Sequence, residues 1–230
     1  MNGYGVTVTT EFQTDSQMLT LFTMRMKTLR KSWKICDGVL LAYDGKETSI
    51  IIPGDIRLIA SGFLSNYSKV KNVTLSYGLE SVSPGAFAGC ESLTQVNFSS
   101  SVRRIEAEAF LDCTMLKTLQ GMTNVEEIGD SAFNGCKALT TVELPETLTR
   151  LGSHAFQDCF DLVEISIPHS LTEIEDHTFY GCISLGDGGT VDLSNTNLQY
   201  IGEKAFANCI SIRHIALPAS LTSLGNYAFE

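Results

Sequence analysis

Six cysteines are the side chains of this sequence best suited to covalent or metal chemistry, and each follows a phenylalanine by three residues: Cys90, Cys113, Cys136, Cys159, Cys182 and Cys209. If the repeated segments stack, equivalent cysteines lie about 5 Å apart, within the Cα separation of a disulfide. A free cysteine, however, is among the most buried residue types and packs as a small hydrophobic side chain. Metal sites usually show closely spaced pairs such as C-x-x-C, which these cysteines lack. We therefore interpret the six as core residues, with disulfides or a zinc site as the alternatives.

Two histidines also share one position of the repeat. His154 and His177 each lie two residues before a repeated phenylalanine, and Asp176 is adjacent to the second. In stacked segments their rings could approach each other, which makes a metal site or a pH sensor conceivable. The alternative, which we favour, is that both are exposed turn residues without a function. His169 and His214 show no comparable pairing.

No constellation for nucleophilic catalysis or phosphate binding is apparent. The sequence has no G-x-S-x-G or H-E-x-x-H motif, and no Ser, Thr or Cys has a convincing base and orienting acid. The glycine-rich stretch at 186–189 lacks the strand, lysine and helix of a phosphate loop, so we interpret it as a tolerated insertion. We therefore expect no enzymatic activity, no cofactor and no metal.

These residues belong to a repeat that spans most of the chain. One copy, Leu139 to Cys159, reads L-T-T-V-E-L-P-E-T-L-T-R-L-G-S-H-A-F-Q-D-C. Its phenylalanine anchor recurs at intervals of 24, 23, 23, 23, 23, 27 and 23 residues, as Phe63, Phe87, Phe110, Phe133, Phe156, Phe179, Phe206 and Phe229. A period near 23 indicates a solenoid in which each copy forms one coil. A single coil cannot close its own core, so each needs a neighbour on either side.

Each coil should contain a strand, because apolar residues alternate with polar ones at Val73/Leu75, Val96/Phe98, Val142/Leu144, Ile165/Ile167, Val191/Leu193 and Ile215/Leu217. Stacking would align these strands into a parallel sheet with a spacing of about 4.8 Å. A second, shorter extended piece follows at 148–151 and its equivalents, and then a brief helical turn that holds the Ala-Phe pair. Two coils depart from the pattern: Gly121 replaces a large apolar residue, and a four-residue insertion near Gly186 should form a loop.

The first 53 residues precede the coils. Residues 1–34 suggest a short strand at Val6 and Val8, and then a helix capped by Asp15 or Ser16 that carries Met18, Leu19, Phe22 and Met26. We interpret them as a cap on the first coil, or else as an extension that binds another molecule or is disordered. The repeat domain, 35–230, should begin with a β-hairpin over 35–53, whose strands Val39–Tyr43 and Ser49–Ile52 flank Asp44-Gly45. Coils follow from about residue 54, and the last is incomplete.

The charge distribution argues against nucleic acid as a partner. The formal net charge is −10, and residues 1–34 carry more basic than acidic residues, so the rest is more acidic still. We interpret the basic cluster as a solvated face: Arg25, Lys27, Arg30, Lys31 and Lys34. No apolar run approaches the roughly 18 residues that span a bilayer, so we expect no membrane insertion. Residues 1–10 do not resemble a signal peptide.

The A-F-x-x-C ladder and the L-P-x-x-L-x-x-L frame resemble the BspA-like leucine-rich repeats. Copies such as V-E-L-P-E-T-L-T-R-L-G-S-H-A-F-Q-D-C and I-S-I-P-H-S-L-T-E-I-E-D-H-T-F-Y-G-C are close to that pattern, as is D-G-V-L-L-A-Y-D-G before the first proline. The resemblance covers residues 37–230 and not 1–34. It implies a right-handed leucine-rich repeat solenoid on the surface of host-associated anaerobic bacteria or of some protist parasites, with a role in adhesion.

A partner would bind at the outward-facing strand positions, because stacked coils present them as one continuous surface. The candidates are Thr74, Asn97, Gln120, Glu143, Glu164, Ser166, Asp192 and His214. They include none of the Trp, Tyr or Arg anchors that dominate tight interfaces, which suggests a modest or avidity-driven interaction. The alternative is a solvated face without a partner.

We therefore predict a non-enzymatic protein–protein interaction module for cell-surface adhesion or host-protein binding, with an unidentified protein partner. The second hypothesis is a structural spacer or assembly domain that continues or self-associates through an open C-terminal end. The resemblance implies a cell-surface or secreted protein, and the lack of a signal peptide in the chain leaves the cytoplasm as an alternative.

Overall fold

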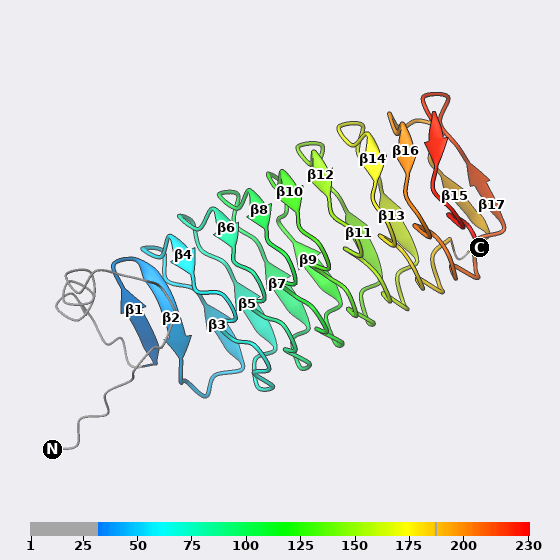
Figure 1. The fold of residues 1–230 in the computed structure, drawn as a ribbon. Helices are drawn as coiled ribbons and strands as arrows, with labels where there is room; N and C mark the ends of the chain where they lie inside the picture. Colours follow the sequence, from blue (N-terminus) through cyan, green and yellow to red (C-terminus); the bar gives the residue numbers. More distant parts are fainter. Residues whose placement is uncertain (1–31, 187) are drawn as a thin grey trace, which may run out of the picture.

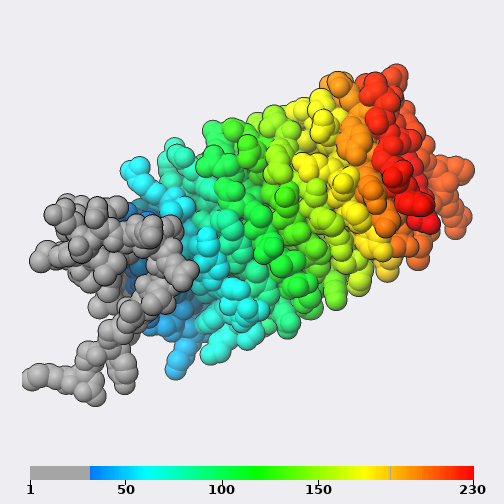
Figure 2. All heavy atoms as spheres, viewed as in Figure 1, coloured from blue at the N-terminus to red at the C-terminus, as the bar shows by residue number. Residues whose placement is uncertain are grey.

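The computed structural model describes residues 32–186 and 188–230, and these form an elongated stack of coils (Figure 1). Each coil gives one strand to a broad sheet: β3 (Ser49–Ile51), β5 (Asn72–Thr74), β7 (Gln95–Asn97), β9 (Thr118–Gln120), β11 (Thr141–Glu143), β13 (Glu164–Ser166), β15 (Thr190–Asp192) and β17 (His214–Ala216). Each also gives a shorter strand to a narrow sheet: β4 (Leu58–Ile59), β6 (Ser81–Val82), β8 (Arg104–Ile105), β10 (Glu127–Ile128), β12 (Arg150–Leu151), β14 (Glu173–Ile174), β16 (Tyr200–Ile201) and β18 (Ser223–Leu224). Paired strands of consecutive coils run parallel, which confirms the predicted solenoid. The space-filled stack is closely packed along its length (Figure 2).

The centre of the stack is a column of phenylalanine rings, here called the phenylalanine column. Successive rings from Phe87 to Phe229 lie 5.2–5.9 Å apart, centroid to centroid, with their planes within 24° of parallel. The rings from Phe87 to Phe179 are completely buried. Because each ring covers the one before it, the column joins all coils into a single hydrophobic core.

The column begins differently from the prediction, because Leu64 and not Phe63 is the first anchor. The backbone N–H of Leu64 donates to the carbonyl of Ala86, and that of Phe87 donates to the carbonyl of Ala109, so Leu64 and Phe87 are equivalent. Phe63 takes the alanine position and meets Phe87 edge-on, at 89° and 6.3 Å. The predicted interval of 24 residues is therefore wrong and the true one is 23. The inter-coil hydrogen bonds set this register, and a leucine fills the anchor site as well as an aromatic ring does.

The segment around each anchor is a series of β-turns, and the predicted helical turn is wrong. The backbone N–H of Asn134 donates to Ser131 and that of Cys136 donates to Phe133, each three residues back. Ser131 and Gly135 have positive φ angles of 55° and 73°, which interrupts any helix. The N–H of Phe133 instead donates to the next coil. No helix occurs in the part of the chain that the structure describes.

The broad sheet is divided into three ladders, β3-β5-β7-β9, β11-β13 and β15-β17. The first break lies beside Gly121, where a Cβ atom would come within 2.4 Å of the Phe98 carbonyl oxygen. The second lies beside the predicted insertion, where Gly186, Gly188 and Gly189 have positive φ angles. The narrow sheet is interrupted between β12 and β14. The predicted continuous sheet thus fails at the coils whose sequence departs from the pattern.

A β-hairpin precedes the coils, but its predicted strands are wrong. β1 (Trp33–Cys36) pairs antiparallel with β2 (Val39–Tyr43) around Asp37-Gly38, whose φ angles are 47° and 79°. Positive φ at both central residues is what a tight two-residue hairpin requires. The expected second strand, β3, pairs in parallel with β5 instead. The boundary predicted at residue 34 falls inside β1, whereas the strand at 6–8, the helix after Asp15 and the basic residues up to Lys31 lie outside the described residues.

Candidate protein-interaction face

All eight candidate binding residues lie on strands of the broad sheet and point away from the core, on what is here called the broad face. In β11, Val142 is buried while Thr141 and Glu143 are exposed, as the two-residue period of a strand requires. Thr74 and Asn97 are half-buried, and the other six candidates are exposed: Gln120, Glu143, Glu164, Ser166, Asp192 and His214. Their position is the one expected from the sequence, and their role in binding stays a prediction.

The part of the broad face over β3 to β9 is uncharged, and its side chains are hydrogen-bonded to one another. The Asn72 amide donates to the hydroxyl of Ser49, with Nδ2 and Oγ 2.9 Å apart. The Gln95 Nε2 atom lies 2.8 Å from Oδ1 of Asn97 and 3.2 Å from Oε1 of Gln120. These contacts order the amides before any partner binds, which lowers the entropic cost of binding. Sequence reasoning missed Ser49 because it assigned that strand to a hairpin.

The part of the broad face over β11 to β15 is acidic. Glu143, Glu164 and Asp192 project from it, and none lies within ion-pair distance of a cation in the described ranges. Hydrogen bonds from Ser194, including one from its backbone N–H at 2.9 Å, lower the pKa of the Asp192 carboxyl. This part of the face therefore presents uncompensated negative charge at neutral pH.

The acidic residues along the narrow sheet are arranged differently, because arginines neutralise them. Arg103 Nη1 lies 3.2 Å from the Glu126 carboxylate, and Arg150 Nη2 lies 2.9 Å from the Asp130 carboxylate. Exposed ion pairs of this kind contribute little to stability, but they remove local charge. The unpaired negative potential is therefore concentrated on the broad face, where it would attract and orient a cationic partner.

The six laddered cysteines are buried free thiols, which confirms that they pack in the core. Each thiol donates to a backbone carbonyl of the preceding coil, for example Cys113 to Phe87 at 3.1 Å and Cys159 to Phe133 at 3.3 Å. Burial raises the pKa of every one of them, to about 12 for Cys90. Since the thiolate is the reactive form, these thiols are poor nucleophiles at neutral pH.

The two equivalent histidines do meet. The rings of His154 and His177 stack with centroids 4.7 Å apart and planes 16° from parallel. Parallel rings direct their nitrogen lone pairs along parallel lines, which suits two ligands of one metal ion poorly. Within 32–186 and 188–230, no group of three or more His, Cys, Asp or Glu side chains is arranged to hold a metal.

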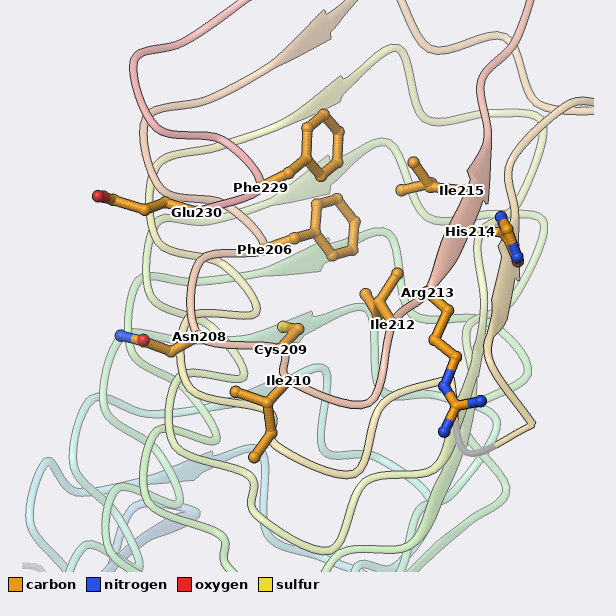
Figure 3. A pocket seen from close by; sticks show the side chains of 10 residues that line it. All are labelled: Phe206, Asn208, Cys209, Ile210, Ile212, Arg213, His214, Ile215, Phe229 and Glu230. Atoms are coloured by element: carbon orange, nitrogen blue, oxygen red, sulfur yellow. The ribbon is translucent and has the colours of Figure 1, made fainter.

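The last coil leaves a hollow at the C-terminal end of the stack (Figure 3). The rings of Phe206 and Phe229 form one side of it, and Ile212 and Ile215 project from the opposite strand (Figure 3). Ile210 beside it is 77% exposed, whereas the equivalent Ile183 one coil earlier is 39% exposed. This end therefore presents apolar surface that an added coil would cover.

Parallel coils of 23 residues around a column of buried anchors define a leucine-rich repeat solenoid. The chain belongs to the family of the BspA type leucine rich repeat region, whose sequence profile matches residues 40–162 and 116–230. Solenoids of this family are generally not enzymes. No curated protein matches the chain.

Several solved bacterial structures share the fold. A leucine rich repeat protein of T. pallidum is 25% identical with a TM-score of 0.70, over 76% of this chain and 82% of that one. A leucine-rich repeat protein of Bacteroides ovatus is 26% identical with a TM-score of 0.75, over 82% of this chain and 51% of that one. A leucine rich cell surface protein of Faecalibacterium prausnitzii is 27% identical with a TM-score of 0.68, over 77% and 49%. The chain thus spans about half the length of the last two.

Among the residues that the structure describes, no helix has the length and apolar character needed to cross a bilayer.

Proposed function

We propose that this chain is a non-enzymatic protein-interaction module that binds its partner through the broad face. Leucine-rich repeat proteins of this kind typically bind other proteins, and stacking provides an extended surface for it. The observation that carries the proposal is the set of unpaired carboxylates of Glu143, Glu164 and Asp192 beside an ordered amide array. Their charge favours a partner that presents lysine or arginine side chains.

The setting that we propose is adhesion at a cell surface, with a host extracellular or cell-surface protein as the partner. The similar Faecalibacterium prausnitzii protein is described as a leucine rich cell surface protein, which supports this setting. Protease treatment of intact source cells tests the location. Loss of the protein from intact cells is expected, and full protection until lysis would contradict surface exposure.

A binding assay with matched charge variants tests the broad face. The purified chain is passed over immobilised host extracellular-matrix and cell-surface proteins by surface plasmon resonance. Replacing Glu143 and Glu164 by arginine should weaken any binding by roughly tenfold or more, because the partner then meets like charge. The control replaces Glu91 and Glu173, exposed residues off the broad face, and makes the same change in net charge.

The control variant should bind like the unmodified chain, and added salt should weaken that binding. Equal losses in both variants would show that only net charge matters and that the broad face is not the site. An unmodified chain that binds none of the immobilised proteins would contradict the adhesive role.

The apolar end of the stack favours a second candidate function, namely assembly through that end. Leu217, Leu224, Tyr227 and Phe229 are exposed there together with Ile210. Light scattering at increasing concentration should then detect association, and Leu224→Glu should reduce it. A monomer at all concentrations would rule out assembly by this chain.

A further inference from the structure

One junction between coils lacks part of its backbone pairing. β12 pairs with β10 and β14 pairs with β16, but no ladder joins β12 to β14. On the other side of the same junction, β11 and β13 are paired in full register. The coils of Phe156 and Phe179 are therefore joined by a ladder along the broad sheet but not along the narrow sheet.

Side chains bridge the coils where the ladder is missing. Ser153 Oγ donates to Oε2 of Glu175 at 2.9 Å, and Arg150 Nε lies 3.6 Å from Oε1 of the same carboxylate. Next to them, His154 and His177 stack across the junction at 4.7 Å. The narrow-sheet side of this junction thus depends on polar side chains to a degree that the β8–β10 and β10–β12 junctions do not.

The histidine rings are poorly placed to accept protons. His177 Nδ1 is buried without a hydrogen-bond partner, so a proton on it would have no acceptor. The ring also faces Tyr180, at a centroid distance of 5.6 Å. His154 Nδ1 shares a hydrogen bond of 2.6 Å with Oε1 of Gln157, whose amide in turn contacts Asp158.

The charged groups around His177 do not offset this burial. Lys204 occupies the equivalent position of the next coil, so a protonated pair would continue a row of cations. The nearby acids are Asp176 and Glu203, and Oδ1 of Asp176 already accepts the Glu203 backbone N–H at 2.7 Å and approaches the Tyr200 hydroxyl at 3.5 Å. The pKa of His177 is lowered by its burial first, and then by His154 and Lys204.

We propose that the junction between the coils of Phe156 and Phe179 is a pH-sensitive hinge, which opens along the narrow sheet when His154 and His177 become protonated. Two stacked cations repel each other and the adjacent Lys204, and the side-chain bridge has no backbone ladder behind it. The intact β11–β13 ladder acts as the hinge axis. Acidification would therefore change the curvature of the solenoid and the spacing of the residues on the broad face.

Hydrogen–deuterium exchange at about pH 7.5 and about pH 5.5, on either side of the usual histidine pKa, tests the hinge. After correction for intrinsic exchange rates, amides of residues 173–180 should exchange roughly threefold or more faster at the lower pH. Residues 104–111, where β8 and β10 are paired, serve as the internal control and should show no such change. An equal acceleration of both segments would overturn the proposal.

Residues found at the same position in other coils provide the variants. Ser131 has a φ angle of 55° there, so replacing His154 and His177 by serine fits the backbone and should abolish the acceleration. Lys204 has a φ angle of 52°, so His177→Lys also fits and should give fast exchange at both pH values. Replacing the exposed His169 and His214 by serine is the matched control and should leave the wild-type response intact.

Each variant can contradict the hinge. If the double serine variant keeps the acid response, other groups cause it. If His177→Lys exchanges as slowly as the wild type at the higher pH, a positive charge at this position does not open the junction.

Discussion

At the scale of single residues, the phenylalanine column supplies most of the core of each coil. Phe156 is completely buried between Phe133 and Phe179, with ring centroids 5.3 and 5.9 Å away. Removing it would leave a cavity between two rigid neighbours that are themselves held by the stack.

Phe156→Ala should therefore reduce the free energy of unfolding by roughly 3–5 kcal/mol, measured by chemical denaturation. Phe160→Ala is the control, because Phe160 is half-buried and its ring lies under the Lys137 ammonium at 5.4 Å. The control should cost less than Phe156→Ala. A loss of less than about 1 kcal/mol for Phe156→Ala would show that its cavity closes without cost.

The laddered thiols should be unreactive while the coils are folded. Burial raises the pKa of Cys113, Cys136 and Cys182 well above the ordinary thiol value, so almost no thiolate exists at neutral pH. A thiol reagent in water should label the native protein only on the time scale of unfolding. In denaturant, all seven cysteines should react. Rapid labelling of the native protein would contradict core packing.

At the scale of elements, the turns of consecutive coils interlock through alternating Asx and glycine residues. Asp112 and Asp158 alternate with Gly135 and Gly181 two residues after the anchors, and all four have positive φ angles. The aspartate covers the glycine of the next coil so closely that a Cβ on Gly135 would lie 2.3 Å from Oδ1 of Asp112. The pattern therefore repeats over pairs of coils.

Gly135→Ala should destabilise the protein by about 1–3 kcal/mol, because it combines a strained φ angle with this clash. Gly85→Ala is the matched control, since Gly85 has a φ angle of 60° but no atom within 4 Å of the added Cβ. It should cost less, and the difference in denaturation midpoint measures the clash. In an Asp112→Gly background the two alanine substitutions should cost the same. A persistent excess for Gly135→Ala there would show that Asp112 is not the cause.

At the scale of the whole molecule, the chain is a rod of stacked coils with most contacts between neighbours. Eight broad-sheet strands at about 4.8 Å spacing give a stack on the order of 35–40 Å long. Far-UV circular dichroism should therefore show β-structure without a strong helical signal, and small-angle scattering should give the profile of an elongated particle. A spectrum dominated by helix, or the scattering of a sphere, would contradict this architecture.

The apolar positions of the sequence were sufficient to predict the solenoid, the strand of each coil and the outward rows. Val142 between Thr141 and Glu143 shows why: in a strand, side chains alternate between the two faces, so residue type reports the face directly. The same periodicity placed the cysteines in the core and brought His154 next to His177.

The tertiary structure alone decided how coils meet. Two Asp-Gly pairs compete for the hairpin, and only pairing with residues 33–36 selects Asp37-Gly38. Leu64 replaces Phe63 as the anchor because the hydrogen bonds of the neighbouring coil set the register. Which carboxylates are neutralised by arginine, and which junction lacks a ladder, likewise depend on atoms at least 20 residues apart in the chain. A local pattern determines which side of a coil a residue occupies, whereas the contacts it makes there depend on the neighbouring coil.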